Sequence, residues 1–411
     1  MASCFGRVAA RIVAAGGAIV AVASIGSTLA IGQGCSEKAP PPAAAEPIVI
    51  GVSLGLTKDL DTFTAPLRDA VRVAEGEINA AGGLLGRPVV FDVQDDRSDE
   101  GDFVKSVAND FVKKKVVAVI GPVGSQQVKV TQDIYAAAQI IQLTPSATST
   151  ELAGLQPQNG DRYLFRTTPD DAFQGAAVML FAQKTPRGIG DAGAPVGDGG
   201  VADTCNKLAI VQIDNSYGNA MGDVIEQTWP KRPTSSGTRT VVQRKKISTE
   251  LAPSYAADAA EIIAKGPECL VLISYEKTAA QFVTDFKKDP GFPALESKGF
   301  FFIGTDGVFT PGFLELTREN PSDETSKSYA EQGVYGTNPD TQPITPEYQQ
   351  FRTLYSSYFP LRAGVDAPPF TANTFDAAVL IAFAIQKAGT ATDHVASATR
   401  SARSPRRPAG R

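Results

Sequence analysis

The stretch VVAVIGPVGSQQVKVTQDIYAAAQIIQLTPSATS, residues 116–149, contains two short apolar runs separated by a helix-like segment. The first run, 116–120, is entirely apolar, and the second covers 139–143. Residues 126–137 between them are expected to form a helix. A buried strand, a crossover helix and a second strand make a βαβ unit, whose strands lie parallel in one sheet. This stretch therefore predicts an α/β fold.

The same alternation continues on both sides of this unit. Strands are expected at 48–52 and 89–93, with helices at 66–80 and 101–113. The pattern restarts at a helix at 171–183 and continues with strands at 208–213, 241–247, 269–273 and 299–303, separated by helices at 218–228, 253–265 and 277–287. Two α/β units in tandem, each with a parallel sheet covered by helices, account for this order.

The segments after the second unit indicate how the two units are joined. A short run at 334–337 precedes a helix at 346–358 and an apolar helix at 372–387. The last helix has no strand partner of its own, so we expect it to pack on the first unit. The first lobe would comprise 48–168 plus 337–389 and the second lobe 169–336. The chain would then cross between lobes more than once, which makes a hinge.

The N-terminus, residues 1–35, is typical of an export signal. Arg7 and Arg11 precede an apolar stretch of small residues at 12–31, and Cys35 follows Gly-Gln-Gly. A cysteine at this place indicates a lipoprotein signal, which would anchor the protein to a bacterial membrane facing the periplasm or the cell surface. An ordinary cleaved signal and an uncleaved anchor helix are the alternatives. Residues 36–47 form a Pro/Ala-rich linker.

Two further segments differ from the rest of the chain in composition. Residues 186–200 are rich in glycine and are expected to form a mobile loop. The tail, 390–411, has five arginines in its last dozen residues and no apolar period. It is predicted to be disordered, either as a natural tail or because out-of-frame sequence replaces a missing C-terminal portion.

Cys205 and Cys269 remain once the signal cysteines are set aside. Each lies at or just before the start of an expected strand. If these strands are parallel neighbours, both sulfurs lie at one edge of the sheet. The oxidising compartment implied by export then allows a disulfide between them.

Composition argues against several classes of function. The formal net charge of −5 does not suit a nucleic-acid partner, which needs clustered Lys and Arg. The single histidine, His394, lies in the tail, so no serine has a histidine base nearby. Cysteine–histidine clusters of the kind that bind metals are absent from the sequence. An enzyme is therefore disfavoured, and no cofactor is expected. Asp95 and Asp96 are interpreted as a solvated acidic turn.

Ligands in open parallel sheets bind beyond the carboxyl ends of the strands, so the residues that follow each strand are the candidates. In the first unit these are hydroxyl residues and glycines, including Ser125 and Thr148. In the second unit they include Tyr217, Tyr275 and Asp306. Hydroxyls and free backbone N–H groups suit a carboxylate, and a carboxylate side chain suits an ammonium. Facing each other across a cleft, the two sets would bind a zwitterion.

Five stretches in this order and spacing carry a family resemblance: EINAAGG (77–83), VIGPVGS (119–125), TPSAT (144–148), FRTT (165–168) and SYG (216–218). The chain resembles the periplasmic leucine/isoleucine/valine-binding proteins, the type I solute-binding proteins of ABC importers. The resemblance covers most of the chain, from about residue 48 to residue 387. It implies two Rossmann-like lobes with parallel sheets, joined by a hinge with several crossovers.

The resemblance also implies binding roles. Ser125 and the backbone N–H of Thr148 would hold a ligand carboxylate, and the Ser146 carbonyl, the Thr148 hydroxyl and Asp306 would hold its ammonium. Ala147 lies within the same segment, Tyr217 and Tyr275 would close from the second lobe, and Phe63 would line the side-chain pocket. Helix capping is the alternative role for Ser125 and Thr148, and core packing is the alternative for Phe63.

The chain departs from the family pattern in several places, including Asp306 and the C-terminus. Asp306 stands where relatives often have a glutamate. Relatives also continue well past 387 with another crossover and strand, so the fold is expected to be C-terminally incomplete and less stable than a full-length relative.

The implied function is capture of a branched-chain or other small amino acid, or an amide-like solute, by a monomer that delivers it to an ABC permease. A ligand-sensing module with the same fold is the alternative.

Overall fold

The computed structural model describes residues 45–155, 161–184, 205–234, 237–308, 310–318, 330, 333–339, 345–360 and 367–391. The expected signal segment with Cys35, most of the expected linker, the glycine-rich segment 186–200 and the tail beyond 391 lie outside these residues.

The first lobe contains a five-stranded parallel sheet with the order β2-β1-β3-β4-β5. Its strands are β1 (Ile48–Leu54), β2 (Val89–Asp95), β3 (Ala118–Ile120), β4 (Ile141–Thr144) and β5 (Leu164–Arg166). Its helices are α2 (Asp61–Ala80), α3 (Asp102–Lys114) and α4 (Ser125–Ala137), with short 3-10 turns η2 (Lys58–Leu60) and η3 (Thr150–Gly154). Helices cover both faces, so the strands are apolar along most of their length.

The second lobe repeats this arrangement with the order β10-β9-β8-β6-β7, again all parallel. Its strands are β6 (Lys207–Ile213), β7 (Thr240–Ile247), β8 (Cys269–Ile273), β9 (Phe301–Gly304) and β10 (Val334–Gly336). Its helices are α5 (Asp171–Lys184), α6 (Ser216–Thr228), α7 (Ala256–Ile263), α8 (Glu276–Lys288), α9 (Phe292–Glu296) and α10 (Pro311–Leu316), with η5 (Trp229–Lys231) following α6. The predicted fold of two parallel α/β lobes is confirmed.

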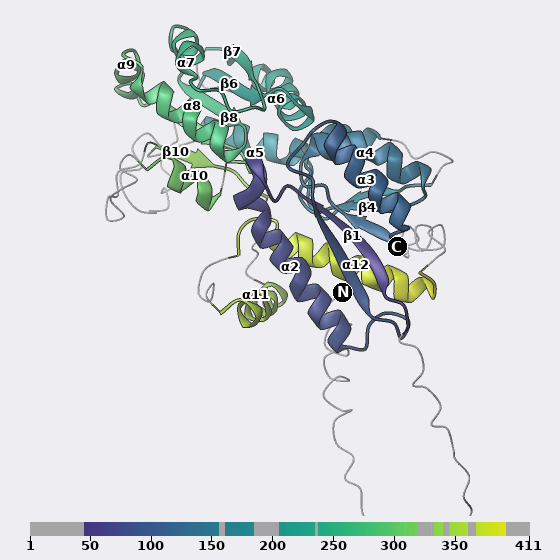
Figure 1. Cartoon of the computed structure of the whole chain (residues 1–411). Helices are drawn as coiled ribbons and strands as arrows, with labels where there is room; N and C mark the ends of the chain where they lie inside the picture. The colour runs from purple at the N-terminus through teal and green to yellow at the C-terminus, as the bar shows by residue number, and fades with distance from the viewer. Residues whose placement is uncertain are drawn as a thin grey trace, which may run out of the picture.

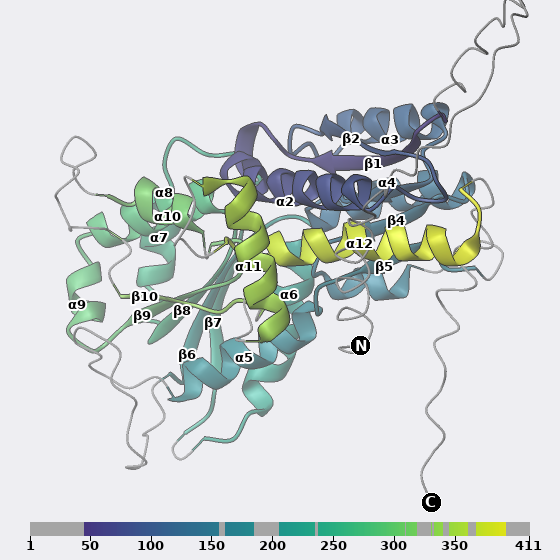
Figure 2. The ribbon, with the colours of Figure 1, turned by 90° about the horizontal axis from the view of Figure 1, so that it is seen from below.

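The last two helices, α11 (Pro346–Tyr358) and α12 (Thr371–Ala388), return to the first lobe and lie beside α2 (Figures 1 and 2). Tyr355 of α11 and Val73 of α2 belong to the same hydrophobic cluster. Ile381 and Ile385 of α12 join the core formed by β1 and α2. The chain therefore crosses between lobes after β5 and again after β10. The apolar helix expected at 372–387, which has no strand partner of its own, had indicated such a return to the first lobe.

The two cysteines of the second lobe form a disulfide. β6 and β8 are neighbours in the sheet, with Leu208 paired to Cys269. Cys205, two residues before β6, lies with its Cα 5.9 Å from that of Cys269 and is bonded to it. The bridge lies at the amino ends of these strands.

Three local features of the first lobe differ from the sequence analysis. We expected α2 to begin at Pro66, but the helix begins at Asp61 and contains Pro66. β5 was not predicted as a strand, because only two of its three residues are apolar and two are only partly buried. The third difference concerns Asp96.

Asp96 is buried rather than part of a solvated turn. It is 1% exposed and accepts hydrogen bonds from Ser53 Oγ (2.7 Å) and the Ser98 backbone N–H (3.0 Å). Burial raises the pKa of Asp96 to about 6. Asp95 accepts from the N–H of Leu56 and the hydroxyl of Thr57. The acidic pair thus ties the loop after β1 to the loop after β2.

Replacing Gly121 with alanine is expected to destabilise the protein more than replacing Gly82 with alanine. Both glycines have positive φ, +94° and +98°, where alanine costs about 1–2 kcal/mol. A Cβ at Gly121 would also overlap the Ser53 carbonyl oxygen, whereas a Cβ at Gly82 would meet nothing within 4 Å. Urea unfolding should show Gly121→Ala at least about 1 kcal/mol less stable than the matched Gly82→Ala control. Equal losses would contradict the proposed close approach of β3 to β1.

Candidate functional site

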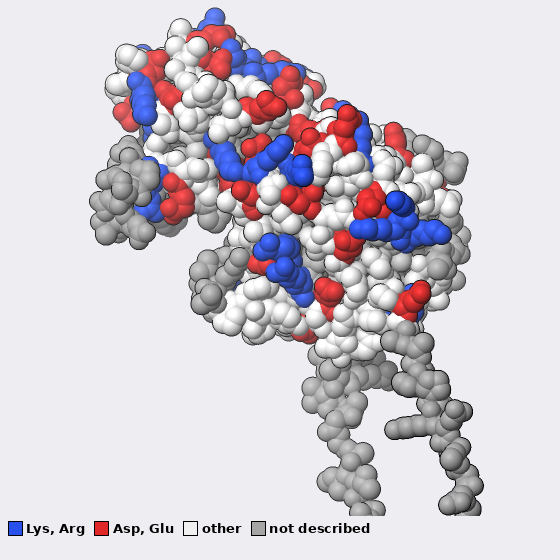
Figure 3. Space-filling view, viewed as in Figure 1, with Lys and Arg blue, Asp and Glu red and all other residues white. Residues whose placement is uncertain are grey.

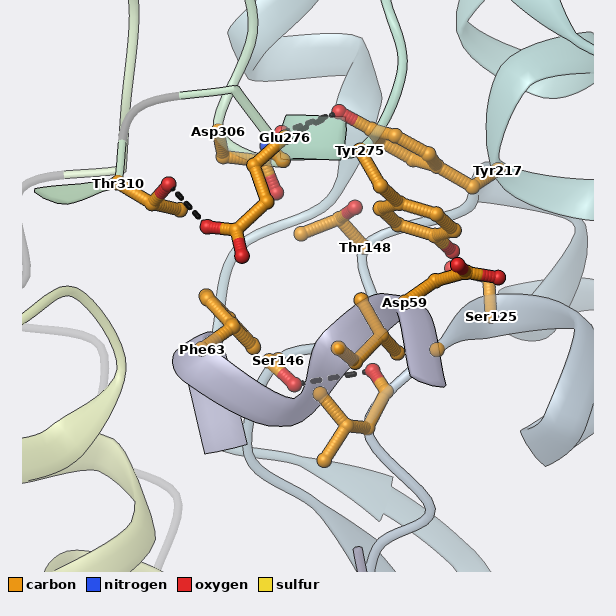
Figure 4. Close-up of a pocket in the computed structure, with 14 residues that line it drawn as sticks. Asp59, Phe63, Ser125, Ser146, Thr148, Tyr217, Tyr275, Glu276, Asp306 and Thr310 are labelled. Atoms are coloured by element: carbon orange, nitrogen blue, oxygen red, sulfur yellow. Dashed lines mark hydrogen bonds between the residues drawn. The ribbon is translucent and has the colours of Figure 1, made fainter. Parts of the chain in front are cut away.

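A cavity lies between the two lobes, at the carboxyl ends of the strands (Figure 4). The space between the surrounding atoms, counted with the open mouth and the solvent in it, is about 430 Å³. The loops after β1, β3 and β4 line it from the first lobe, and the loops after β6, β8 and β9 line it from the second. The residues that line it are Asp59, Leu60, Phe63, Val123, Gly124, Ser125, Ser146, Thr148, Tyr217, Tyr275, Glu276, Asp306, Gly307 and Thr310.

The first-lobe half of the site consists of two loops bonded to each other. Ser125, the first residue of α4, accepts a hydrogen bond from the N–H of Ser149 at 3.1 Å. Ser146 donates its hydroxyl to the carbonyl of Val123 at 2.9 Å. These bonds hold the hydroxyl-rich loop after β4 against the start of α4. The first N–H groups of a helix lack partners within that helix, so this end of α4 suits an anion.

The capping alternative for the first-lobe residues is wrong. Gly124, not Ser125, is the N-cap of α4, and no side chain caps it. Ser149, not Thr148, caps η3 by accepting from the N–H of Glu151. Ser125 and Thr148 are therefore both buried beside the cavity without serving as caps.

The second-lobe half contains two tyrosines and a buried carboxylate. The rings of Tyr217 and Tyr275 stack with centroids 5.8 Å apart and planes 12° apart. Tyr217 donates its hydroxyl to Asp306 Oδ1 at 2.8 Å, and the same hydroxyl lies 2.7 Å from Thr305 Oγ1. Burial raises the pKa of Asp306 to about 6, although the bond from Tyr217 opposes the rise. Asp306 is thus a buried acceptor with no cationic partner among the described side chains.

Phe63 and Ala147 differ in their relation to the cavity. Phe63 lines it and also packs edge-on against Phe370, with ring centroids 5.7 Å apart. Phe63 therefore lines the cavity and packs in the core, and its contact with a ligand side chain stays a prediction. Ala147 does not line the cavity. It belongs to a small core with Val128 and Leu164, and its N–H donates to Thr144 Oγ1. The expected cavity residues other than Ala147 are brought together.

The model of the periplasmic binding protein family matches residues 47–410. The chain belongs to the periplasmic binding protein family. It is 24% identical over 367 residues to the Leu/Ile/Val-binding protein BraC3 of Rhizobium johnstonii, a match that covers 87% of this chain and 84% of BraC3.

Two further relatives are more partial or more distant. The chain is 28% identical over 185 residues to the chemotactic signal transduction system substrate-binding protein BasB of Halobacterium salinarum, a match that covers 44% of this chain and 41% of BasB. The branched-chain amino acid transporter substrate-binding protein LivJ of Streptococcus pneumoniae, solved in complex with isoleucine, superposes with a TM-score of 0.64 at 18% identity over 86% of this chain and 88% of LivJ. The last likeness shows the shared fold.

Sequence reasoning missed four polar residues at this periplasmic binding protein's site. Asp59, Glu276 and Thr310 line the cavity, and Asp171 lies behind it at the start of α5. Glu276 directly follows Tyr275, so its place after a strand was a signal that could have been read. Asp171 is fully buried, and neither of its carboxylate oxygens has a hydrogen-bond partner of ordinary geometry in the described part of the chain. Burial and the nearby Asp306 raise the pKa of Asp171 well above its usual value, although Thr148 opposes this.

The two lobes of the binding protein touch at both sides of the cavity. On one side, Ser149 Oγ donates to the Ser216 carbonyl at 3.0 Å, and Asn215 Nδ2 donates to Glu100 Oε1 at 2.6 Å. On the other side, Lys277 Nζ lies 3.1 Å from Asp61 Oδ1. Burial in this interface raises the pKa of Glu100 to about 7. The structure therefore represents a closed arrangement of the lobes.

Three features outside the cavity of the binding protein concern nucleic acid, membranes and metal ions as partners. On the face in Figure 3, Lys and Arg are interspersed with Asp and Glu, which does not suit a nucleic-acid backbone. In the described ranges, no helix is long and apolar enough to cross a bilayer. Among the same residues, no group of three or more His, Cys, Asp and Glu side chains is placed to hold a metal ion.

Proposed function

We propose that this protein captures a small zwitterionic amino acid between its lobes and delivers it to the permease of an ABC importer. One observation carries the proposal. A single cavity combines a helix start and hydroxyls on the first lobe with a buried, cation-free carboxylate, Asp306, on the second. A carboxylate beside Ser125 and an ammonium beside Asp306 would pair both charges of such a ligand.

Closure supplies the mechanism of capture. The ligand bridges the two halves of the site and so stabilises the closed arrangement over the open one. The stacked tyrosines would cover it from the second lobe. No catalytic base is implied, so the protein binds without turnover. The relatives' printed names, Leu/Ile/Val-binding for BraC3 and a complex with isoleucine for LivJ, support an amino-acid ligand.

We place the protein outside the cytoplasm, as its family membership supports. A lipid on Cys35 would hold it at the membrane, and the protein would act as a monomer. Mass spectrometry of the mature protein, isolated from its native membrane, tests the lipid on Cys35. An unmodified N-terminus in that sample would contradict it.

Isothermal titration calorimetry with a panel of amino acids tests the proposed function. At least one should bind with a Kd in the micromolar range or below. Ser125→Ala should weaken that binding by about tenfold, because it removes one hydrogen bond to a charged group. If a folded sample binds no amino acid, the proposal is wrong.

Ligand affinity is expected to fall as the pH falls below about 6. In the closed form without ligand, burial raises the pKa of Asp306 to about 6, so acid protonates the group that must receive the ammonium. Opening exposes this carboxyl and lowers its pKa, so the fall begins at pH 6 or below. Linkage to one proton limits the fall to about tenfold per pH unit.

Glu100 has the opposite effect on the pH dependence. Its pKa is raised to about 7 in the closed interface, so protonation there favours closure as the pH falls through 7. Calorimetry in a Glu100→Gln background removes this opposing effect. An affinity that stays constant from pH 7.5 to pH 4.5 in this background would contradict ammonium binding by Asp306.

Sensing is the second candidate function. The partial match to the chemotactic binding protein BasB is the observation behind it, whereas the longer match to BraC3 favours transport. The same capture would then present the closed form to a receptor. Co-purification of the liganded protein with a permease, or instead with a transmembrane receptor, separates the two functions.

A further inference from the structure

The cavity has more negative charge than a simple zwitterion requires. Asp59, Glu276 and Asp306 line it, and no Lys, Arg or His is among the described residues that do so. A neutral amino acid would bring one ammonium, which Asp306 would receive, and one carboxylate. Glu276 would then remain buried without a counter-charge, although a buried carboxylate is ordinarily paired with a cation.

Glu276 is held in place but not neutralised. It is the first residue of α8 and is 2% exposed. Thr310 Oγ1 donates to its Oε2 at 2.5 Å, and Thr62 of the first lobe donates to its Oε1. Both donors are neutral hydroxyls. Lys277, the next residue, forms its ion pair with Asp61 and acts on the Glu276 carboxylate only through its charge, without a direct contact.

The position of Glu276 separates it from the place of the ligand carboxylate. Figure 4 shows Ser125 and Glu276 on opposite sides of the cavity, with Thr148 between them. Leu60, Phe63 and Val123 add apolar surface to the lining. If Ser125 and Thr148 hold the head group of a ligand, its side chain would extend along this apolar surface. The end of that side chain would then lie beside Glu276.

Two independent observations indicate that the protein's own groups do not satisfy this region. Both carboxylate oxygens of Asp171 are buried without a hydrogen-bond partner of ordinary geometry, and Asp171 acts electrostatically on Asp306, Tyr217 and Tyr275. Thr148 and Arg166 offset only part of the effect of burial on its charge. The Tyr275 hydroxyl, on a residue that lines the cavity, is also buried without a partner of ordinary geometry. A ligand with a net positive charge would supply donors to these acceptors and offset the repulsion between Asp171 and Asp306.

We propose that the ligand carries a second cationic group at the end of its side chain and that Glu276 receives it. The ligand class is that of basic amino acids with an aliphatic stem, such as lysine and ornithine. This inference rests on the proposed capture of an amino acid in the same cavity. The bond from Thr62 also makes Glu276 a contact between the lobes, so the test must separate selectivity from closure.

The experiment compares lysine with norleucine, which has a similar stem and lacks the terminal ammonium. Calorimetry at one pH and salt concentration would measure both Kd values for the wild-type protein, for Glu276→Gln and for Glu100→Gln. Wild type should bind lysine at least about tenfold more tightly than norleucine. Glu276→Gln should bring this ratio close to one, whatever it does to either Kd alone. Glu100→Gln alters a closure contact outside the cavity, so it should shift both Kd values alike and keep the ratio.

Each result decides a different point. Binding of norleucine as tight as or tighter than that of lysine to the wild type would overturn the inference and leave the proposed function standing. A lysine preference that survives Glu276→Gln would overturn the role of Glu276, as would an equal loss of the preference in Glu100→Gln. Failure of the folded wild type to bind any amino acid would refute the proposed function itself.

Discussion

Asp306→Ala is expected to raise the Kd for the amino-acid ligand by about 30- to 1,000-fold. The carboxylate of Asp306 is buried at the carboxyl end of β9 and is oriented by the Tyr217 hydroxyl. Truncating one partner of a buried, hydrogen-bonded charge pair costs about 2–4 kcal/mol of binding free energy. Calorimetry on the purified variant measures the change directly.

Two comparisons separate a lost contact from a damaged fold. Asp306→Asn keeps the shape of the side chain and an acceptor for Tyr217 but removes the charge, so it should lose most of the same affinity. Asp223→Ala removes a carboxylate that is exposed and paired with Arg244 away from the cavity, and it should bind as wild type does. Without ligand, Asp306→Ala should be at least as stable as wild type, because it relieves the repulsion with Asp171. A Kd within threefold of wild type would rule out the assigned role.

The fold could be predicted because the sequence patterns that specify its strands and helices are local. The run at 116–120 and its neighbours consist of residues buried on both faces of a parallel sheet, which gives short apolar segments that a reader can recognise. The strand β5 was not predicted, because Leu164–Arg166 is short and contains an arginine. The guanidinium of this arginine donates hydrogen bonds to the carbonyls of Thr148 and Ser149. Those hydrogen bonds depend on the tertiary fold, and no local sequence pattern indicates them.

The site was predictable only in part, for the same reason. Ser125, Tyr217 and Asp306 follow strands, and the rule that ligands bind at strand ends located them. Asp96 looked like a solvated carboxylate because its burial depends on Ser53, 43 residues earlier. Glu276 is bonded to Thr62, which is 214 residues away, and only the closed arrangement of the lobes brings the two together. Contacts of this range cannot be read from periodicity or spacing.

Removing the disulfide is expected to lower the free energy of unfolding by about 2–4 kcal/mol. Cys205 and Cys269 are separated by 64 positions, and closing a loop of that length in the unfolded chain is worth about 4 kcal/mol in the chain-entropy model. The Cys205→Ala/Cys269→Ala double variant is the appropriate change, because both positions are fully buried and serine would leave unpaired hydroxyls there. Urea unfolding should give a lower midpoint and an m-value no smaller than that of wild type, since the unfolded chain is released from a constraint.

The same double variant should bind its ligand with unchanged affinity. The disulfide lies at the amino ends of β6 and β8, whereas Tyr217 and Tyr275 follow the carboxyl ends of those strands. The intervening strands remain hydrogen-bonded to each other along their length, so they hold the two tyrosines in place without the bridge. Wild type unfolded under reducing conditions is the matched control and should show the same loss of stability. Full stability of the double variant would contradict the stabilising role of the bridge. A large change in Kd in the folded variant would show that the two ends of the sheet are coupled, and that the division between a stabilising edge and a binding edge is wrong.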